Sequence, residues 1–263
     1  MQNSSGYNGN ANLKSVNTQI GWTEEMISEY TKCSEDPIYF IDKYVKIITL
    51  DKGLQPFTLF DYQKRYIDAL HSNRFVCSMQ ARQMGKTTTT TAYLLWNAIF
   101  NNDQTIAIVA NKGRSAREVL SRWQQMYEDL PQFLQHGVKT WNKGDVELEN
   151  GTKVFCAATS SSGLRSKSIN YLYIDEYALI PKTIAEDFLT STLPTIFSGK
   201  TSKITITSTP LGYNHFYDLW DGAEKGINGY IPIKVEWFEN PNRDENWLEE
   251  QKKILKNDQK VQQ

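Results

Sequence analysis

From residue 74 onward, short apolar runs alternate with longer amphipathic stretches. Six runs combine aliphatic residues with β-branched or aromatic ones: RFVCSM, TIAIVA, TKVFCAA, YLYID, KITITS and YIPIKVEW. The stretches between them, such as TTTTTAYLLWNAIF and GRSAREVLSRWQQMYEDL, are typical of helices. Strands that are apolar on both faces and are separated by helices predict a mostly parallel sheet covered on both sides. The predicted fold class is therefore α/β, doubly wound.

Caps and turn signals predict the remaining elements. Asn150-Gly151, between two strand-like runs, predicts one antiparallel hairpin. Thr23 and Asp36 each precede a helical stretch as N-caps, KIITL at 46–50 is predicted to be a short strand, and Thr58 is expected to begin a third helix.

These elements divide the chain into four segments. Residues 1–17 are rich in Asn, Ser and Gly with almost no aliphatic side chains, so we expect a flexible N-terminal segment. Residues 58–237 contain the predicted sheet and are expected to form the core. Residues 18–57 and the charged, helical residues 238–263 are expected to pack together as a small second lobe.

Composition excludes several classes of function. The 29 Lys+Arg against 30 Asp+Glu leave a formal charge of −1, so a strongly basic nucleic-acid module is not indicated and any DNA contact must be local. Three dispersed cysteines argue against a disulfide framework and favour a reducing compartment, and three dispersed histidines make zinc an unfavoured ligand. No apolar run reaches the roughly 18 to 20 residues of a membrane span, and the N-terminus does not have the pattern of a signal peptide.

The segment RFVCSMQARQMGKTTTT joins a strand to a helix through a polar loop that ends in Gly85-Lys86-Thr87. In such a loop, backbone N–H groups and the helix N-terminus face an anion, Lys86 would reach the β- and γ-phosphates, and the Thr87 hydroxyl could ligate Mg²⁺. The common pattern GxxxxGK[ST] begins with glycine where this chain has Gln80, so the loop must begin with ordinary backbone angles. The threonine run from Thr87 to Thr91 is a poor helix former, and we expect a ligand to explain it. The alternative is an accidental Gly-Lys-Thr at a helix start.

A second candidate element is the run YLYIDE, in which Asp175 and Glu176 end an apolar strand. The carboxyl edge of an open α/β sheet is where ligands bind. Asp175 would hold Mg²⁺ through its water shell, and Glu176 would orient and deprotonate the attacking water. Adjacent acids repel each other, so a cation is expected beside them. The alternative is an ordinary strand end.

Two arginines and one polar strand end could complete such a site. Arg82 lies four residues before Lys86, and Arg165 lies eleven before Glu176 in a loop of small residues. Each could supply charge to a phosphoryl-transfer transition state or could be a surface salt-bridge partner. The hydroxyls of Thr207, Ser208 and Thr209 follow the strand KITI and could sense the γ-phosphate, or form a plain turn.

Base recognition and DNA contact are suggested less directly. The amide of Gln63 could bind the edge of adenine, with Tyr62 or Phe57 stacked on the base, or could be solvated beside core aromatics. Candidate DNA contacts are basic side chains in a helical run and near a loop: Lys112, Arg114, Arg117, Arg122, Lys200 and Lys203. Acids interleave with the helical ones, so a solvated helix face is the favoured alternative.

Together these residues resemble the ATPase part of a tailed-phage terminase large subunit of the myovirus type, the motor that pumps double-stranded DNA into a procapsid. The resemblance spans roughly residues 58–237 and rests on four motifs: DYQ, QARQMGKTT, YIDEYALIP and TSTPLGYNHFYDLW. It implies a P-loop NTPase fold of the ASCE/RecA-like type with a small helical lid subdomain, and a Mg-dependent ATPase.

The resemblance also implies a role for each candidate residue. Gln63 would read adenine, and the nucleotide would be bound by Gln83, Met84, Gly85, Lys86, Thr87 and Thr88. Thr87 and Asp175 would hold Mg²⁺, and Glu176 would be the catalytic base. Arg82 would be an arginine finger in cis and Arg165 one in trans, while Thr207, Ser208 and Thr209 would couple hydrolysis to movement.

The partners implied are double-stranded DNA, a portal protein, a small terminase subunit and further copies of the chain in a ring, with a monomer expected in isolation. The implied setting is the host cytoplasm, with transient docking on a procapsid and no membrane. Family members usually continue into an RNase H-like nuclease, but no acid triad follows the last motif, so nuclease activity is not expected in this chain. One alternative is a P-loop helicase fragment, although a second lobe of about 150 residues would then be needed and only about 25 residues follow Trp237. The other is a nucleotide-gated assembly module without turnover.

Overall fold

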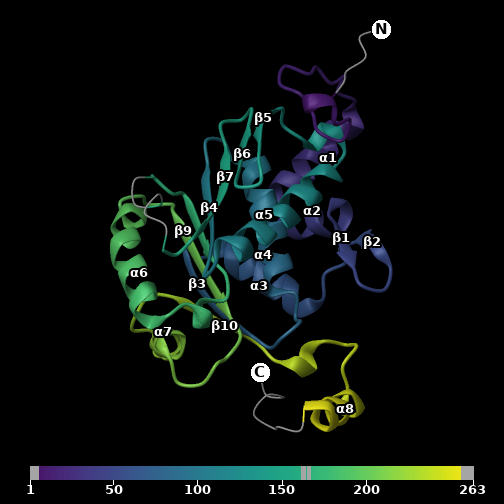
Figure 1. The fold of residues 1–263 in the computed structure, drawn as a ribbon. Coiled ribbons are helices and arrows are strands. Elements are labelled where there is room, and N and C mark those ends of the chain that lie inside the picture. Colours follow the sequence, from purple (N-terminus) through teal and green to yellow (C-terminus); the bar gives the residue numbers. More distant parts are fainter. Residues whose placement is uncertain (1–5, 161–163, 165–166, 256–263) are drawn as a thin grey trace.

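The computed structural model describes residues 6–160, 164 and 167–255, and Figure 1 shows their arrangement. Within these residues one sheet has eight strands in the order β10-β3-β9-β8-β4-β7-β6-β5. The strands are β3 (Phe75–Gln80), β4 (Thr105–Ala110), β5 (Val138–Trp141), β6 (Asp145–Leu148), β7 (Lys153–Ala158), β8 (Tyr171–Ile174), β9 (Lys203–Ser208) and β10 (Ile231–Val235).

The six runs singled out in the sequence are six of these strands, and they pair parallel to one another from β10 through β7. β6 pairs antiparallel with β7 and with β5, and Gly151 in the β6–β7 connection has a positive φ of 82°. The mostly parallel sheet and the antiparallel hairpin at Asn150-Gly151 are therefore confirmed, while the antiparallel pair of β5 and β6 was not predicted. The sheet is apolar because helices cover both of its faces.

Two groups of helices form the outer layers (Figure 1). One core cluster contains buried residues of α1 (Glu24–Glu35), α2 (Pro37–Tyr44), α3 (Asp61–Ser72), α4 (Lys86–Phe100) and α5 (Gly113–Glu128). The other contains buried residues of α6 (Lys182–Phe197) and α7 (His215–Glu224). Thr23 and Asp36 cap α1 and α2 as expected, whereas α3 begins at Asp61 rather than after Thr58. No helix of the described residues is long and apolar enough to cross a membrane.

The strand order places the predicted motifs at one edge of the sheet. β9 lies between β3, which precedes the phosphate-loop sequence, and β8, which precedes the two acids. Because these three strands are parallel, their carboxyl ends share one edge. At this edge Ser208 of β9 pairs with Met79 of β3.

The prediction of a flexible segment at residues 1–17 is wrong for residues 6–17, which pack onto the core. Leu13 is buried, and the Val138 backbone N–H donates to the Lys14 carbonyl at 2.8 Å. The Lys14 backbone N–H donates to the side chain of Gln135. Composition missed this because one leucine and several backbone hydrogen bonds to distant residues anchor the segment.

The prediction of one lobe shared by the chain ends is also wrong. The α1 and α2 helices belong to the main core: Cys33 and Phe40 are buried, and Trp96 of α4 donates its indole N–H to the Cys33 carbonyl at 2.8 Å. In Figure 1 the C-terminal helix α8 (Glu245–Leu255) lies at the opposite end of the molecule from α1. β1 (Lys46–Thr49) and β2 (Gly53–Pro56) form a separate two-stranded hairpin. The proposed core bounds of 58–237 stay a prediction.

Candidate active site

The loop between β3 and α4 turns close to the start of α4 and not at Gln80, where the common pattern has its first glycine. Gln80 still belongs to β3, is buried and has no positive φ, which confirms that the departure from glycine is tolerated by ordinary backbone angles. The left-handed residues are instead Gln83, with φ of 59°, and Gly85, with φ of 78°. Turns of this kind point successive N–H groups to one side and create an anion-binding concavity. The positive φ is the main reason for glycine at position 85; a Cβ there would also lie 2.8 Å from the Gln63 amide nitrogen, and that side chain would have to shift.

Lys86, the first residue of α4, pairs with Glu176 across the sheet edge. Its Nζ lies 2.6 Å from Glu176 Oε1, and the two side chains are 9% and 32% exposed. Glu176 has a positive φ of 52°, a backbone conformation that costs about 1–2 kcal/mol for a residue with a Cβ. Such a conformation persists where surrounding contacts hold it and is typical of functional sites.

Asp175 is buried among hydroxyl groups. The Thr87 hydroxyl donates to its carboxylate, with 3.2 Å to each oxygen. The Tyr173 and Thr207 hydroxyls donate to Oδ1 at 2.8 and 3.0 Å. Burial raises the pKa of Asp175, and the Tyr173 hydrogen bond opposes that rise. A bound cation would further favour the carboxylate form.

The end of β9 touches both acids. Thr207 contacts Asp175, and Thr209 donates its backbone N–H and its hydroxyl to Glu176 Oε2 at 3.4 and 3.3 Å. The Ser208 hydroxyl accepts from the backbone N–H of Ala178, just after the acids. The three residues predicted to sense hydrolysis are therefore brought together with the acid pair.

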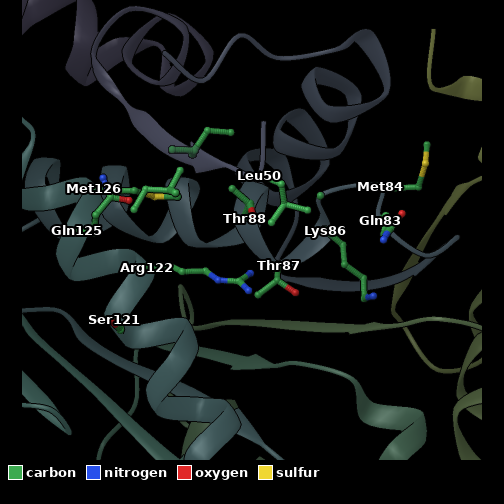
Figure 2. Close-up of a pocket in the computed structure, with 13 residues that line it drawn as sticks. Leu50, Gln83, Met84, Lys86, Thr87, Thr88, Ser121, Arg122, Gln125 and Met126 are labelled. Atoms are coloured by element: carbon green, nitrogen blue, oxygen red, sulfur yellow. The ribbon is translucent and has the colours of Figure 1, made fainter. Parts of the chain in front are cut away.

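A cavity of about 690 Å³ opens beside the loop. It is lined by loop and α4 residues (Gln83, Met84, Gly85, Lys86, Thr87, Thr88), by the β1–β2 hairpin (Ile47, Ile48, Leu50) and by α5 (Ser121, Arg122, Gln125, Met126). Six of the seven residues predicted to bind nucleotide thus line this one cavity. Figure 2 shows the Arg122 side chain extending from α5 toward Thr87, so Arg122 contributes to the cavity lining. A DNA contact by Arg122 stays a prediction.

Other predicted residues lie elsewhere. The Gln63 amide accepts from the Phe60 backbone N–H at 3.0 Å and donates to the Met84 carbonyl at 3.4 Å, and Gln63 is not among the residues lining the cavity. The Arg82 side chain is exposed and does not line the cavity either. Arg165 lies outside the described residues.

The expectation that a ligand explains the whole threonine run is wrong. Thr87 and Thr88 line the cavity, but Thr89, Thr90 and Thr91 are buried. Thr90 and Thr91 donate their hydroxyls to the carbonyls four residues earlier in α4, at 2.8 and 2.7 Å. Such back-bonding satisfies a hydroxyl inside a helix.

The DNA-contact candidates are divided by the structure. Arg114 is exposed and pairs with Glu118 one turn later on α5. Lys203 is different, because its Nζ donates to the carbonyls of Leu70 and His71 at 2.6 Å each and so caps the end of α3. Lys203 is therefore committed to a structural contact.

Sequence reasoning missed three residues of this region: Tyr173, Arg122 and Arg243. Tyr173 could have been found, because residues two apart in a strand share a face and Tyr173 precedes Asp175 by two. Arg122 was singled out only as a DNA-contact candidate; its place in the cavity lining could not be predicted, since its direction depends on how α5 packs. Arg243, which donates to the carbonyl of Arg82, lies 161 residues from it.

The loop after β3, the acids after β8 and the interposed β9 define a P-loop NTPase fold. A family model for the N-terminal part of the terminase large subunit, T4likevirus type, matches residues 77–263. The chain belongs to this family.

Solved structures agree on the fold. The large terminase of bacteriophage HK97 superimposes with a TM-score of 0.67 at 20% identity, covering 82% of this chain and 47% of that one. The large terminase ATPase domain of Thermus phage P74-26 gives 0.60 at 17% identity, covering 74% of this chain and 90% of that one. A large terminase from a thermophilic bacteriophage, solved in complex with ADP, gives 0.56 at 14% identity, covering 74% and 50%. This chain thus spans about half the length of the HK97 protein.

Proposed function

We propose that this chain is the ATP-hydrolysing motor domain of a viral terminase large subunit and powers the packaging of double-stranded DNA into a procapsid. The observation that best supports this function is the set of contacts between the start of α4 and the two acids that follow β8. There Lys86 lies 2.6 Å from Glu176, and Thr87 lies 3.2 Å from Asp175. A lysine, a hydroxyl and two acids at one loop are the parts that hydrolysis of a nucleoside triphosphate uses. Complexes of a related terminase with ADP and with ATP-γ-S support nucleotide as the ligand.

Binding of the triphosphate would replace Glu176 with phosphate oxygens as the partner of the Lys86 ammonium group. In the structure its ammonium group is paired with Glu176. Phosphate oxygens at the loop would attract the ammonium more strongly, since they carry more charge. Glu176 would then be released to orient and deprotonate the attacking water, while Thr209 retains the other carboxylate oxygen.

The residues present fit Mg²⁺. Mg²⁺ prefers oxygen ligands and is usually held by one or two protein groups together with phosphates and water. The Thr87 hydroxyl and the buried Asp175 carboxylate are such a pair, already within 3.2 Å of each other. When bound there, Mg²⁺ would neutralise charge that develops on the phosphates.

Coupling to movement would begin at β9. Loss of the γ-phosphate changes the charge next to Glu176 and Asp175, and Thr209 and Thr207 contact these acids directly. Any shift of either acid therefore reaches β9 through hydrogen bonds.

The remaining roles rest on the family. We propose double-stranded DNA, a portal protein and a small terminase subunit as partners, and a homo-oligomeric ring docked on the procapsid in the host cytoplasm. Arg82 in cis and Arg165 in trans stay the proposed arginine donors, and Gln63 the proposed adenine contact. Arg114 and Arg117 on the exposed side of α5 stay candidates for DNA contact.

Phosphate release from Mg-ATP tests the proposal, measured with and without duplex DNA at low and high protein concentration. Lys86→Ala should weaken nucleotide binding and abolish release. Lys182→Ala is the matched control, because Lys182 is an exposed lysine paired with Glu186 on α6, and it should behave like wild type. Binding of Mg-ATP without release in any condition would favour a nucleotide-gated assembly module, and absence of binding would refute the nucleotide site.

A further inference from the structure

Arg243 reaches the outer side of the phosphate loop from the C-terminal segment. Its two terminal nitrogens each donate to the Arg82 carbonyl oxygen at 3.2 Å, and Nη2 also donates to the Gln83 carbonyl at 3.3 Å. Nη1 lies 3.3 Å from the Met84 sulfur. One guanidinium therefore contacts three successive loop residues.

These contacts favour the conformation that binds anions. In a loop whose N–H groups face the ligand, carbonyl groups point to the opposite side. Gln83 holds a left-handed φ of 59°, which a residue with a Cβ adopts only at a cost. The hydrogen bonds from Arg243 offset that cost and place a positive charge behind the loop.

Aromatic rings hold the guanidinium in place. It stacks over the Trp247 ring at 4.5 Å, and Trp247 stacks on Trp237 with ring centroids 5.8 Å apart and an interplanar angle of 23°. Trp237 lies two residues after the end of β10, and Asp244 caps the first turn of α8 by accepting from the Trp247 backbone N–H. The segment 237–247 thus runs from the sheet edge to α8 as one strap beneath the loop.

A second brace reaches the loop from α3, where Tyr62 donates to the Met84 carbonyl at 3.2 Å. This brace is anchored in the core, because Tyr66 and Leu70 of the same helix are buried. The strap, in contrast, is largely exposed at residues 240–247. The loop is therefore held on one side by the core and on the other by a segment with few buried contacts.

We propose that Arg243 is a positioning residue for the nucleotide site, and that nucleotide binding at the loop and docking of the strap 237–247 stabilise each other. The proposal rests on the proposed function of the loop. By linkage, whatever the docked strap adds to nucleotide affinity, bound nucleotide must add to strap docking. The class of ligand that drives this coupling is a nucleoside di- or triphosphate with Mg²⁺.

Equilibrium titration with Mg-ADP and steady-state ATP hydrolysis test the first half. Arg243→Ala should weaken Mg-ADP binding by about tenfold and raise the KM for ATP more than it lowers kcat, because the loop geometry is lost in the ground state as well as in the transition state. Arg243→Lys should recover only part of the loss, since an ammonium cannot reproduce the guanidinium fork and its stacking. Lys225→Ala is the control: Lys225 has its ion-pair partner, Asp221, on α7 rather than in the strap or the loop, and the variant should stay within about twofold of wild type.

Hydrogen exchange tests the second half. Mg-ADP should slow amide exchange at residues 240–247 in wild type and not in Arg243→Ala. Trp247→Leu, which keeps the arginine but removes its stacking partner, should give intermediate affinity and decides the matter if Arg243→Ala does not fold. A wild-type protein that binds no Mg-ADP would refute the proposed nucleotide site itself. Normal wild-type binding with unchanged affinity and exchange in Arg243→Ala, or an equal loss in Lys225→Ala, would overturn the role of Arg243 alone.

Discussion

Replacing Glu176 with glutamine separates binding from turnover. The change keeps the shape of the side chain and its capacity to accept from Thr209, but it removes the charge that holds Lys86 at 2.6 Å. It also removes the group that would deprotonate water. We therefore expect nucleotide affinity to stay or improve while hydrolysis is lost.

The structure sets the size of both effects. The ion pair is partly exposed on the Glu176 side, at 32%, so its contribution is screened to about 1 kcal/mol or less. Because a bound triphosphate would have to displace this ion pair, removal of the pair should tighten nucleotide binding by no more than about fivefold. Loss of a general base lowers turnover by roughly 10² to 10⁴.

Titration with ATP-γ-S and single-turnover phosphate release measure the two quantities separately. Glu186→Gln is the control, since Glu186 is an exposed acid paired with Lys182 on α6. Turnover near the wild-type level would remove Glu176 from the proposed role. Clearly weaker binding would refute the competition between Glu176 and phosphate for Lys86.

Further changes probe the neighbouring groups. Tyr173→Phe removes a hydrogen bond to the buried Asp175 carboxylate, worth about 1.5–3 kcal/mol. The variant should move the acid limb of the pH–rate profile to higher pH and raise the Mg²⁺ concentration needed for half-maximal rate. An unchanged profile would contradict this. Burial raises the pKa of Asp175 in the folded state, so ionisation of this carboxyl lowers the stability of the folded protein as pH rises above the ordinary carboxyl pKa. Asp175→Asn should therefore raise the Tm of the nucleotide-free protein at neutral pH and raise it less in acid. The same variant should abolish Mg-dependent hydrolysis. If Arg165 acts in trans, mixing Arg165→Ala with Glu176→Gln chains should restore part of the turnover, and activity per chain should rise with concentration; strictly concentration-independent activity would argue against it.

Much of the site could be predicted because its signals are local. Gly85-Lys86-Thr87 lies between a strand and a helix, and the two acids directly follow a buried strand, so chain order alone indicates the chemistry. The parallel sheet then brings both segments to one edge without further information. The left-handed turn at Gln83 could not be predicted in this way, because no glycine marks it.

Predictions from local sequence patterns were wrong for segments whose packing depends on residues that are distant in the sequence. The threonine run was expected to bind a ligand, yet the Thr90 hydroxyl donates to the Lys86 carbonyl and also contacts the Tyr66 hydroxyl of α3 at 2.8 Å. The polar N-terminal segment looked unpacked, yet Leu13 enters the core. The composition of a segment shows how much apolar surface that segment carries, but not which packing and hydrogen-bond partners other segments provide.

The sequence by itself determined the class of fold, the order of its strands along the chain and the residues of the phosphate loop and acid pair, because each depends on neighbours within a few positions. Only the tertiary structure decided that Arg122 faces the cavity, that Gln63 braces the loop, and that Arg243 supports it from 161 residues away. The direction of a long side chain depends on how its element packs, and packing is a property of the whole folded chain.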